Sequence, residues 1–128
     1  MCEFSLAGRR PTDPAEGPKG SIRRIILEKY KKMGLEAKPS KADNGVHASA
    51  SPLEGLAEKA NWIGLDIEAD PFGKALIDSG IAKDTIKEWS LDPRVNLPDG
   101  SQGSIFDALE DLDVEECKTK MIEINNMN

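Results

Sequence analysis

The side chains that most often perform chemistry are few in this chain and do not form a catalytic set. His47 is the only histidine, and it lies in a polar stretch of small residues with no second metal ligand nearby. Cys2 and Cys117 are the only cysteines, and neither has the basic neighbourhood that marks a reactive thiolate. Nucleophilic catalysis needs a nucleophile, a base and an orienting group that converge in a folded region. We therefore predict no catalytic residues, no cofactor and no enzymatic activity.

Carboxylates cluster at two places whose spacing brings calcium to mind. Asp66, Glu68 and Asp70 alternate, but Pro71 occupies the position at which a calcium-binding loop requires glycine. A second window over residues 99–110 also lacks ligands at the required positions. Neither window completes the ligand set, so the sequence predicts no metal site.

Residues 75–89 resemble the turn and recognition helix of helix-turn-helix proteins. The residues that fit are a turn glycine, the aliphatic residue after it and two apolar residues of the second helix, namely Gly80, Ile81, Ile86 and Trp89. The first half departs from the pattern, because Leu76 stands where a small residue is usual and Ser79 where an apolar one is usual. The resemblance implies contacts with bases or phosphates from three side chains of the second helix: Lys83, Thr85 and Lys87.

The charge of this element argues against contact with nucleic acid. Asp84 and Glu88 offset the two lysines of the same helix, and residues 42–128 carry a net charge of −11. Binding to phosphates needs an excess of positive charge. Two helices joined by a glycine turn are also common in small helical bundles. A nucleic-acid-binding regulator with a degenerate helix-turn-helix at 75–89 is therefore kept as the alternative reading.

A basic, amphipathic helix is predicted over residues 22–33. Ser21 is a suitable N-terminal cap, and Gly34 stands where the left-handed residue that ends a helix is favoured. Apolar residues recur at helical spacing along one side, and lysines and arginines cover most of the rest. The residues predicted to bind a partner are Ile22, Arg23, Ile25, Ile26, Lys29, Tyr30 and Met33.

Two interpretations of this helix have equal weight. Its apolar edge could insert into a groove of a partner protein, or the helix could pack on the acidic body of its own chain. Nucleic-acid contact, with Tyr30 able to stack on a base, and binding to anionic lipid carry less weight. Peripheral membrane contact is not expected.

Charge is distributed unevenly along the chain. The 128 residues include 17 lysines and arginines and 23 acidic residues, for a net charge of −6, yet residues 1–41 carry +5. No apolar run is long enough to cross a bilayer, and two cysteines provide no disulfide framework. The opening residues have too short an apolar stretch for a secretory signal. The expected location is the cytoplasm, or the nucleus if the source is eukaryotic.

Helix-capping residues, prolines and glycines separate the apolar segments of the chain, and strand patterns are sparse, so the sequence predicts an all-α fold. Residues 1–20 are expected to form a disordered arm, 21–34 the basic amphipathic helix, 35–50 a flexible linker and 51–128 an acidic helical domain of four to five short helices. The first of these helices, up to about residue 63, should turn five apolar side chains inward: Leu53, Leu56, Ala57, Ala60 and Ile63.

Together these features predict a non-enzymatic regulatory or accessory protein that acts by protein–protein interaction. The basic amphipathic helix would recognise one partner, and the acidic body would engage a second surface. An accessory subunit of a larger enzyme complex would have the same features.

Overall fold

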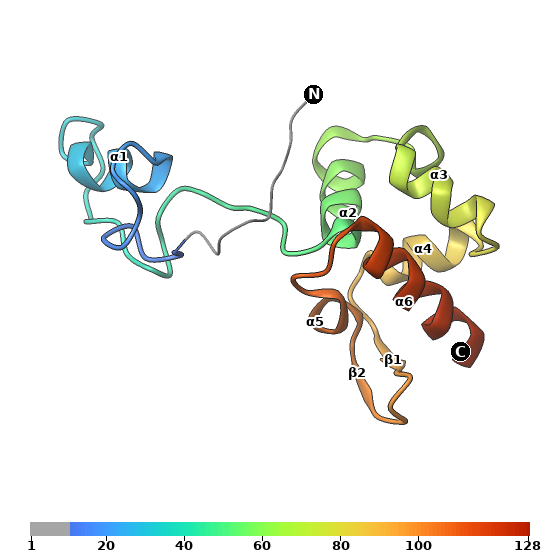
Figure 1. The fold of residues 1–128 in the computed structure, drawn as a ribbon. Coiled ribbons are helices and arrows are strands. Elements are labelled where there is room, and N and C mark those ends of the chain that lie inside the picture. Colours follow the sequence, from blue (N-terminus) through green and yellow to red (C-terminus); the bar gives the residue numbers. More distant parts are fainter. Residues whose placement is uncertain (1–10) are drawn as a thin grey trace. The chain divides into compact units, whose positions relative to one another are not determined.

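The computed structural model describes residues 11–128, which fold as two compact units (Figure 1). Unit 1 extends to Ala48, and unit 2 comprises Ser49–Asn128. Residues 1–10, the first half of the predicted arm with Cys2, lie outside the described residues. Within residues 11–128, six α-helices make up most of the regular structure, and the only strands form one two-stranded sheet. The described chain is therefore mostly helical, as the sequence predicts.

Unit 1 is built around α1 (Ile22–Lys29). Ser21 caps its start, because the Ser21 hydroxyl accepts a hydrogen bond from the backbone N–H three residues further on. The helix ends before the predicted Met33, but the chain continues as a hydrogen-bonded turn in which the Met33 N–H donates to the Lys29 carbonyl at 3.0 Å. Gly34 then adopts a φ of 78°, which confirms the predicted left-handed stop.

The segments before and after α1 form hydrogen-bonded structure where the sequence predicts a disordered arm and a flexible linker. Residues 11–20 form turns in which Pro14 is buried, and Arg24 Nη1 donates to the Ala15 carbonyl at 2.6 Å. In the following segment Asn44 is buried. The low apolar content of both segments suggested disorder. Hydrogen bonds from arginine side chains of α1 reach backbone carbonyls in both segments, and composition does not reveal such contacts.

Unit 2 contains the remaining helices. They are α2 (Pro52–Ile63), the short 3-10 helix η1 (Ile67–Ala69), α3 (Pro71–Asp78), α4 (Lys83–Trp89), α5 (Ile105–Leu109) and α6 (Val114–Met127). Four of these five α-helices, α2, α3, α5 and α6, begin directly after a residue whose side chain caps them, and such caps act locally, whereas α4 begins after Ala82 without a side-chain cap. Ser51 accepts from the Glu54 N–H, and Asp113 forms a capping box with Glu116. Gly64 ends α2 with a φ of 65°.

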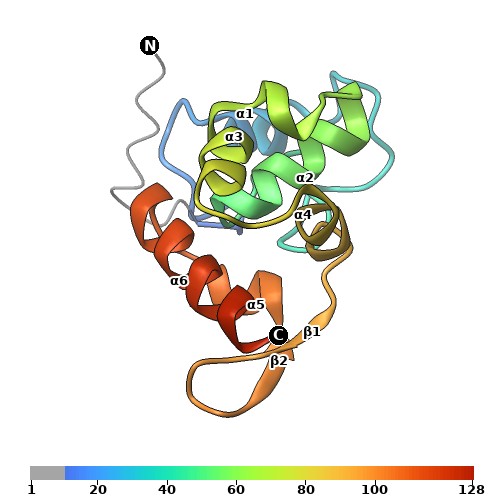
Figure 2. The ribbon, with the colours of Figure 1, turned by 90° about the vertical axis from the view of Figure 1, so that its right-hand side faces the viewer.

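A β-hairpin corrects the prediction that the fold is all-α. Strand β1 (Arg94–Asn96) pairs antiparallel with β2 (Gln102–Ser104), and Val95 stands opposite Gly103. Two strands of three residues are too short to show the alternating pattern that identifies a strand in a sequence. Only Val95 has a buried, β-branched side chain in the pair. The hairpin lies at one end of unit 2, next to α5 and α6 (Figures 1 and 2).

One hydrophobic core lies within unit 2. The buried apolar side chains come from every helix of the unit, from the turn between α3 and α4, and from β1: Leu53, Leu56, Ile67, Leu76, Ile81, Ile86, Trp89, Val95, Ile105, Leu109, Cys117, Met121 and Ile124. Ile63 is not among them. This side chain is largely exposed, because α2 ends at Ile63 and Gly64 turns the chain away. No residue of α1 is buried, so the apolar side of α1 does not build a comparable core in unit 1.

Candidate partner-binding and nucleic-acid-binding surfaces

The exposed side of α1 carries four of the seven residues predicted to bind a partner. Ile22 is 67% exposed and Met33 is 56% exposed, while Ile25 and Lys29 are also classed as exposed. Successive members of this set lie three or four positions apart, which is close to one helical turn. They therefore share one side of the helix and of the turn that follows it. We call Ile22, Ile25, Lys29 and Met33 the α1 face.

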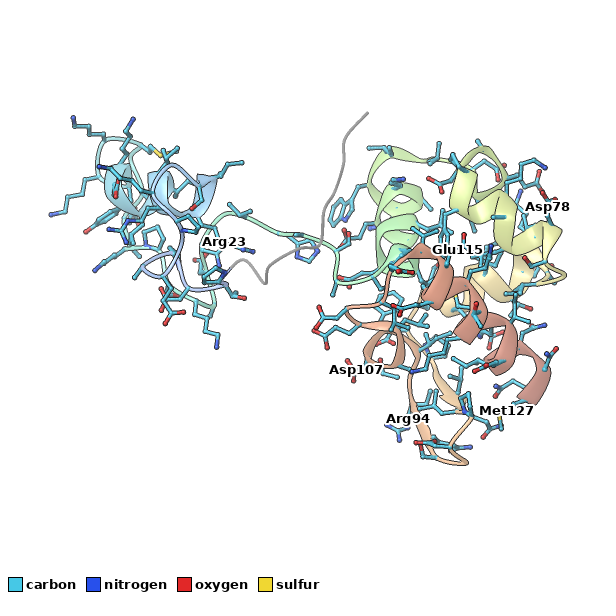
Figure 3. All side chains as sticks on the ribbon, in the orientation of Figure 1. Arg23, Asp78, Arg94, Asp107, Glu115 and Met127 are labelled. Atoms are coloured by element: carbon cyan, nitrogen blue, oxygen red, sulfur yellow. The ribbon has the colours of Figure 1, made fainter. Side chains whose placement is uncertain are left out.

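The other three predicted residues turn toward their own unit. Arg23 is half-buried, and its guanidinium donates three hydrogen bonds, from Nε to Asn44 Oδ1 at 3.3 Å, from Nη2 to the Val46 carbonyl at 3.1 Å and from Nη1 to the Pro11 carbonyl at 3.5 Å (Figure 3). The planar fork of arginine suits several acceptors at once. Arg23 is thus a residue that ties the segments of unit 1 together.

Ile26 and Tyr30 are also half-buried within unit 1. A Cβ built at Gly45 would lie 3.6 Å from Ile26 Cδ1, so the loop around Gly45 covers that side chain. Lys31 Nζ lies 5.9 Å from the centre of the Tyr30 ring, within reach of a cation–π contact. The side of α1 that contains these residues is therefore occupied by its own chain.

Leu35 is an exposed apolar residue that the sequence reading assigned to the linker. Its N–H donates to the Tyr30 carbonyl at 3.0 Å, across the turn that Gly34 closes. Helix ends of this kind commonly carry an apolar residue directly after the glycine. The position of Leu35 directly after Gly34 could therefore have assigned it to the end of the helix and not to the linker.

In the element that resembles a helix-turn-helix, the apolar residues lie in the core and the first lysine of the second helix, Lys83, forms ion pairs. Ile86 and Trp89 are buried in α4. Lys83 Nζ lies 2.7 Å from Asp66 Oδ1 and 3.1 Å from Glu68 Oε1. The hydrogen bond from Lys83 lowers the pKa of Asp66, and the hydrogen bonds with the two carboxylates raise the pKa of Lys83.

The other two residues of α4 that were predicted to contact nucleic acid are Thr85 and Lys87. Lys87 Nζ lies 3.8 Å from Asp84 Oδ1, at the outer limit of an ion pair, and Thr85 is half-buried. A phosphate would have to compete with Asp66 and Glu68 for Lys83. On α4, Lys83 is therefore held by two carboxylates, whereas Lys87 is more than half exposed.

Cys117 is packed in the core of unit 2. Its thiol is fully buried in α6, and Sγ lies 3.8 Å from Met121 Sδ. Burial raises the pKa of Cys117 to about 11, well above the range of reactive thiols. Cys117 is therefore a packing residue of α6 and lacks the features of a reactive thiol.

Within residues 11–128, no helix is both long enough and apolar enough to cross a membrane. No protein-family model matches this chain, no curated protein does, and no solved structure does.

Proposed function

We propose that this protein is a non-enzymatic regulatory or accessory protein that acts by protein–protein interaction, with the α1 face as a partner-binding surface. The observation that carries the proposal is the exposure of Ile22, Ile25 and Met33. Chain segments of unit 1 fold against the opposite side of the same helix, yet they leave this side uncovered.

The energy available at the α1 face supports docking. Fully burying an isoleucine or methionine side chain contributes about 1.5–3 kcal/mol. Ile22 and Met33 keep more than half of their surface exposed, so most of that contribution is unused in unit 1. Three such side chains on one helical side are the pattern by which amphipathic helices bind grooves on other proteins.

The charge around the α1 face indicates what the groove should look like. Lys29 lies within the face, and Lys31 and Lys32 are exposed in the turn that follows α1. Residues 1–48 contain ten basic and six acidic residues. A partner with an apolar groove and carboxylates at its rim would complement both features, and opposite charges would speed association.

The test is to replace apolar residues of the α1 face in the full chain and measure partner binding. Ile22→Asp and Ile25→Asp should each weaken binding by about tenfold or more, because a carboxylate would be buried in an apolar groove. Ala37→Asp is the matched control, since Ala37 is an exposed residue of the same unit outside the face. Proteins retained by wild type are identified by affinity capture, and a purified one is titrated by calorimetry. A partner bound equally by wild type, Ile22→Asp and Ile25→Asp would overturn the proposal.

The alternative, a nucleic-acid-binding regulator acting through Lys83, Thr85 and Lys87, makes a different prediction. Its binding would weaken linearly with the logarithm of salt concentration, by about one unit of slope per phosphate contact. The burial of Ile86 and Trp89 supports the resemblance on which this alternative rests. The ion pairs of Lys83 with Asp66 and Glu68 oppose it. A Lys83→Gln variant that lowers that slope would favour the alternative over docking by the α1 face.

A further inference from the structure

Unit 2 has an open groove of about 490 Å³ that lies among α2, η1, α4 and α5. Small side chains form part of its lining, because Ala57 and Ala60 of α2 both face it. Ile67, Leu91 and Phe106 contribute larger apolar surfaces. The lining of the groove is thus mainly apolar.

Leu91 is the most prominent apolar residue at this groove, with 84% of its surface exposed. The fold holds it in that position. Its N–H donates to the Glu88 carbonyl at 3.0 Å, and the next residue, Asp92, adopts a φ of 54°. Asp92 Oδ1 accepts hydrogen bonds from Ser104 Oγ at 2.6 Å and from the Phe106 N–H at 3.0 Å. The turn that carries Leu91 is therefore tied to the start of α5, and its exposure is built into unit 2.

Apolar exposure continues along α2. Trp62 is 79% exposed and lies four residues after Glu58, so the two side chains are neighbours on the helix surface. Glu58 itself lines the groove. A ligand longer than the groove could therefore cover Trp62 as well as Leu91.

Charge determines which class of ligand suits this surface. Unit 2 contains 17 acidic and seven basic residues, a net charge of −10. Glu54 and Glu58 line the groove, against Lys87 as its only basic lining residue. The Asp111 N–H donates to the Ala50 carbonyl at 3.0 Å, which brings the acidic end of α5 next to the start of α2. A second copy of unit 2 would be repelled here, whereas a cationic ligand would be attracted.

The groove is lined by residues of helices and turns, so a strand could not add to a sheet edge at this place. We propose that the groove binds a cationic amphipathic helix of a partner protein. Apolar side chains of that helix would contact Ala57 and Ala60 between Leu91 and Phe106, and its lysines or arginines would lie toward Glu54 and Glu58. This second docking site belongs to unit 2 and does not depend on the α1 face.

The experiment uses a fluorescein-labelled synthetic helix of leucine and lysine, about 15–20 residues long so that it can become helical on binding. Its binding to the full chain is followed by fluorescence anisotropy, and the site is mapped from backbone amide shifts by NMR. We expect saturable binding with the largest shifts at Ala57, Ala60, Leu91 and Phe106. Leu91→Asp and Leu91→Ser should each weaken binding by about tenfold.

Two controls separate groove binding from general attraction to an acidic protein. Val114→Asp introduces the same charge at another exposed apolar position of unit 2, and it should leave the affinity unchanged. A peptide of the same composition with its leucines scattered around the helix should bind about tenfold more weakly than the amphipathic one. Equal affinity of the two peptides, or shifts confined to residues 107–116, would overturn the proposal.

A different occupant of the groove would give a different result. Sedimentation that shows a concentration-dependent dimer, lost in Leu91→Asp, would identify a second copy as the occupant and overturn the proposal. Peptide binding is also measured with the Ile25→Asp chain. We expect this variant to bind the peptide as wild type does, because Ile25 belongs to the α1 face and not to the groove. The groove proposal can therefore fail or hold independently of the α1 proposal.

Discussion

Lys59 and Asp70 form an ion pair that joins α2 to the start of α3, with Lys59 Nζ 2.7 Å from Asp70 Oδ2. The aspartate side chain is only 4% exposed, whereas the lysine is half exposed. Asp70 Oδ1 accepts hydrogen bonds from the backbone N–H groups of Phe72 at 2.9 Å and Gly73 at 3.3 Å. One carboxylate therefore caps α3 and ties α3 to the neighbouring helix.

The stability of unit 2 should fall in acid partly because of Asp70. Burial would raise the pKa of Asp70, but the hydrogen bonds from Lys59, Phe72 and Gly73 outweigh it and hold the pKa below the usual 3.8. A lowered folded-state pKa means that this contribution is complete above pH of about 4–5 and is lost as the pH falls through the folded-state pKa. The difference in the free energy of unfolding between wild type and Asp70→Asn should therefore shrink below about pH 4. Urea titrations at several pH values measure it.

Asp78→Asn is the control for this effect. Asp78 pairs with Lys74 at 3.2 Å, but both side chains are well exposed, and such pairs contribute little. Asp70→Ala should lower the free energy of unfolding by about 1–2 kcal/mol at neutral pH, which is the usual effect of losing a helix cap. Equal acid transitions for wild type and Asp70→Asn would show that the ion pair has no role in acid stability.

Gly73→Ala should destabilise unit 2 although alanine favours helices. A Cβ at Gly73 would overlap the carbonyl oxygen of Ile67, which belongs to the backbone of η1 and cannot rotate away. We expect a loss of about 1–3 kcal/mol, as for other forced insertions into packed cores. Thermal and urea unfolding followed by circular dichroism measure the change.

Gly55→Ala provides the opposite expectation in the same unit. A Cβ at Gly55 would lie 3.7 Å from the nearest atoms, Cβ and Oγ of Ser49, at ordinary contact distance. Because Gly55 lies inside α2, this substitution should stabilise unit 2 by about 0.5–1 kcal/mol. Destabilisation by both substitutions to the same extent would contradict the close approach of η1 to α3.

Arg23→Lys should loosen unit 1 while preserving its charge. Lysine cannot reproduce the fork that reaches Asn44 Oδ1 and the Val46 carbonyl together. The Val46 N–H, which donates to Asn44 Oδ1 at 3.1 Å, should then exchange with solvent faster. Hydrogen exchange followed by NMR measures that rate, with Lys38→Gln, a change at an exposed residue of the same unit, as the control. Unchanged exchange at Val46 in Arg23→Lys would show that Arg23 does not hold this loop.

Cys117 should resist thiol reagents in the native protein. Its thiol is buried and its pKa lies near 11, so the thiolate is scarce at pH 8. In a Cys2→Ser chain, labelling by a disulfide reagent should be slow and should accelerate when denaturant unfolds unit 2. Rapid labelling without denaturant would contradict the packing of α6 against the core.

Features that act over a few residues were predictable from the sequence. The caps Ser51, Asp70 and Asp113 and the stop at Gly64 lie within five residues of the backbone groups that they bond, so their spacing is visible in the chain. The hairpin was not predictable in this way, because Val95 pairs with Gly103 across an irregular segment that carries only turn signals.

The candidate site shows the same division. Helical spacing predicted that Ile22, Ile25 and Met33 share one side of the helix, and all three are exposed in the structure. Spacing could not show that Arg23 is engaged by Asn44 and Val46, residues more than twenty positions further along the chain. Contacts between distant residues determine which side of a helix its own chain covers.

The sequence by itself determined where α2, α3, α5 and α6 begin, because the caps Ser51, Asp70, Ser104 and Asp113 act locally. It also determined the opposite charges of the two parts of the chain. Only the tertiary structure decided which apolar side chains stay outside the core. Ile63 and Leu91 have the same apolar character as buried neighbours such as Leu56 and Ile86, yet they are exposed. Each lies where a helix has ended and the chain turns away, and that position depends on how the helices pack around one core.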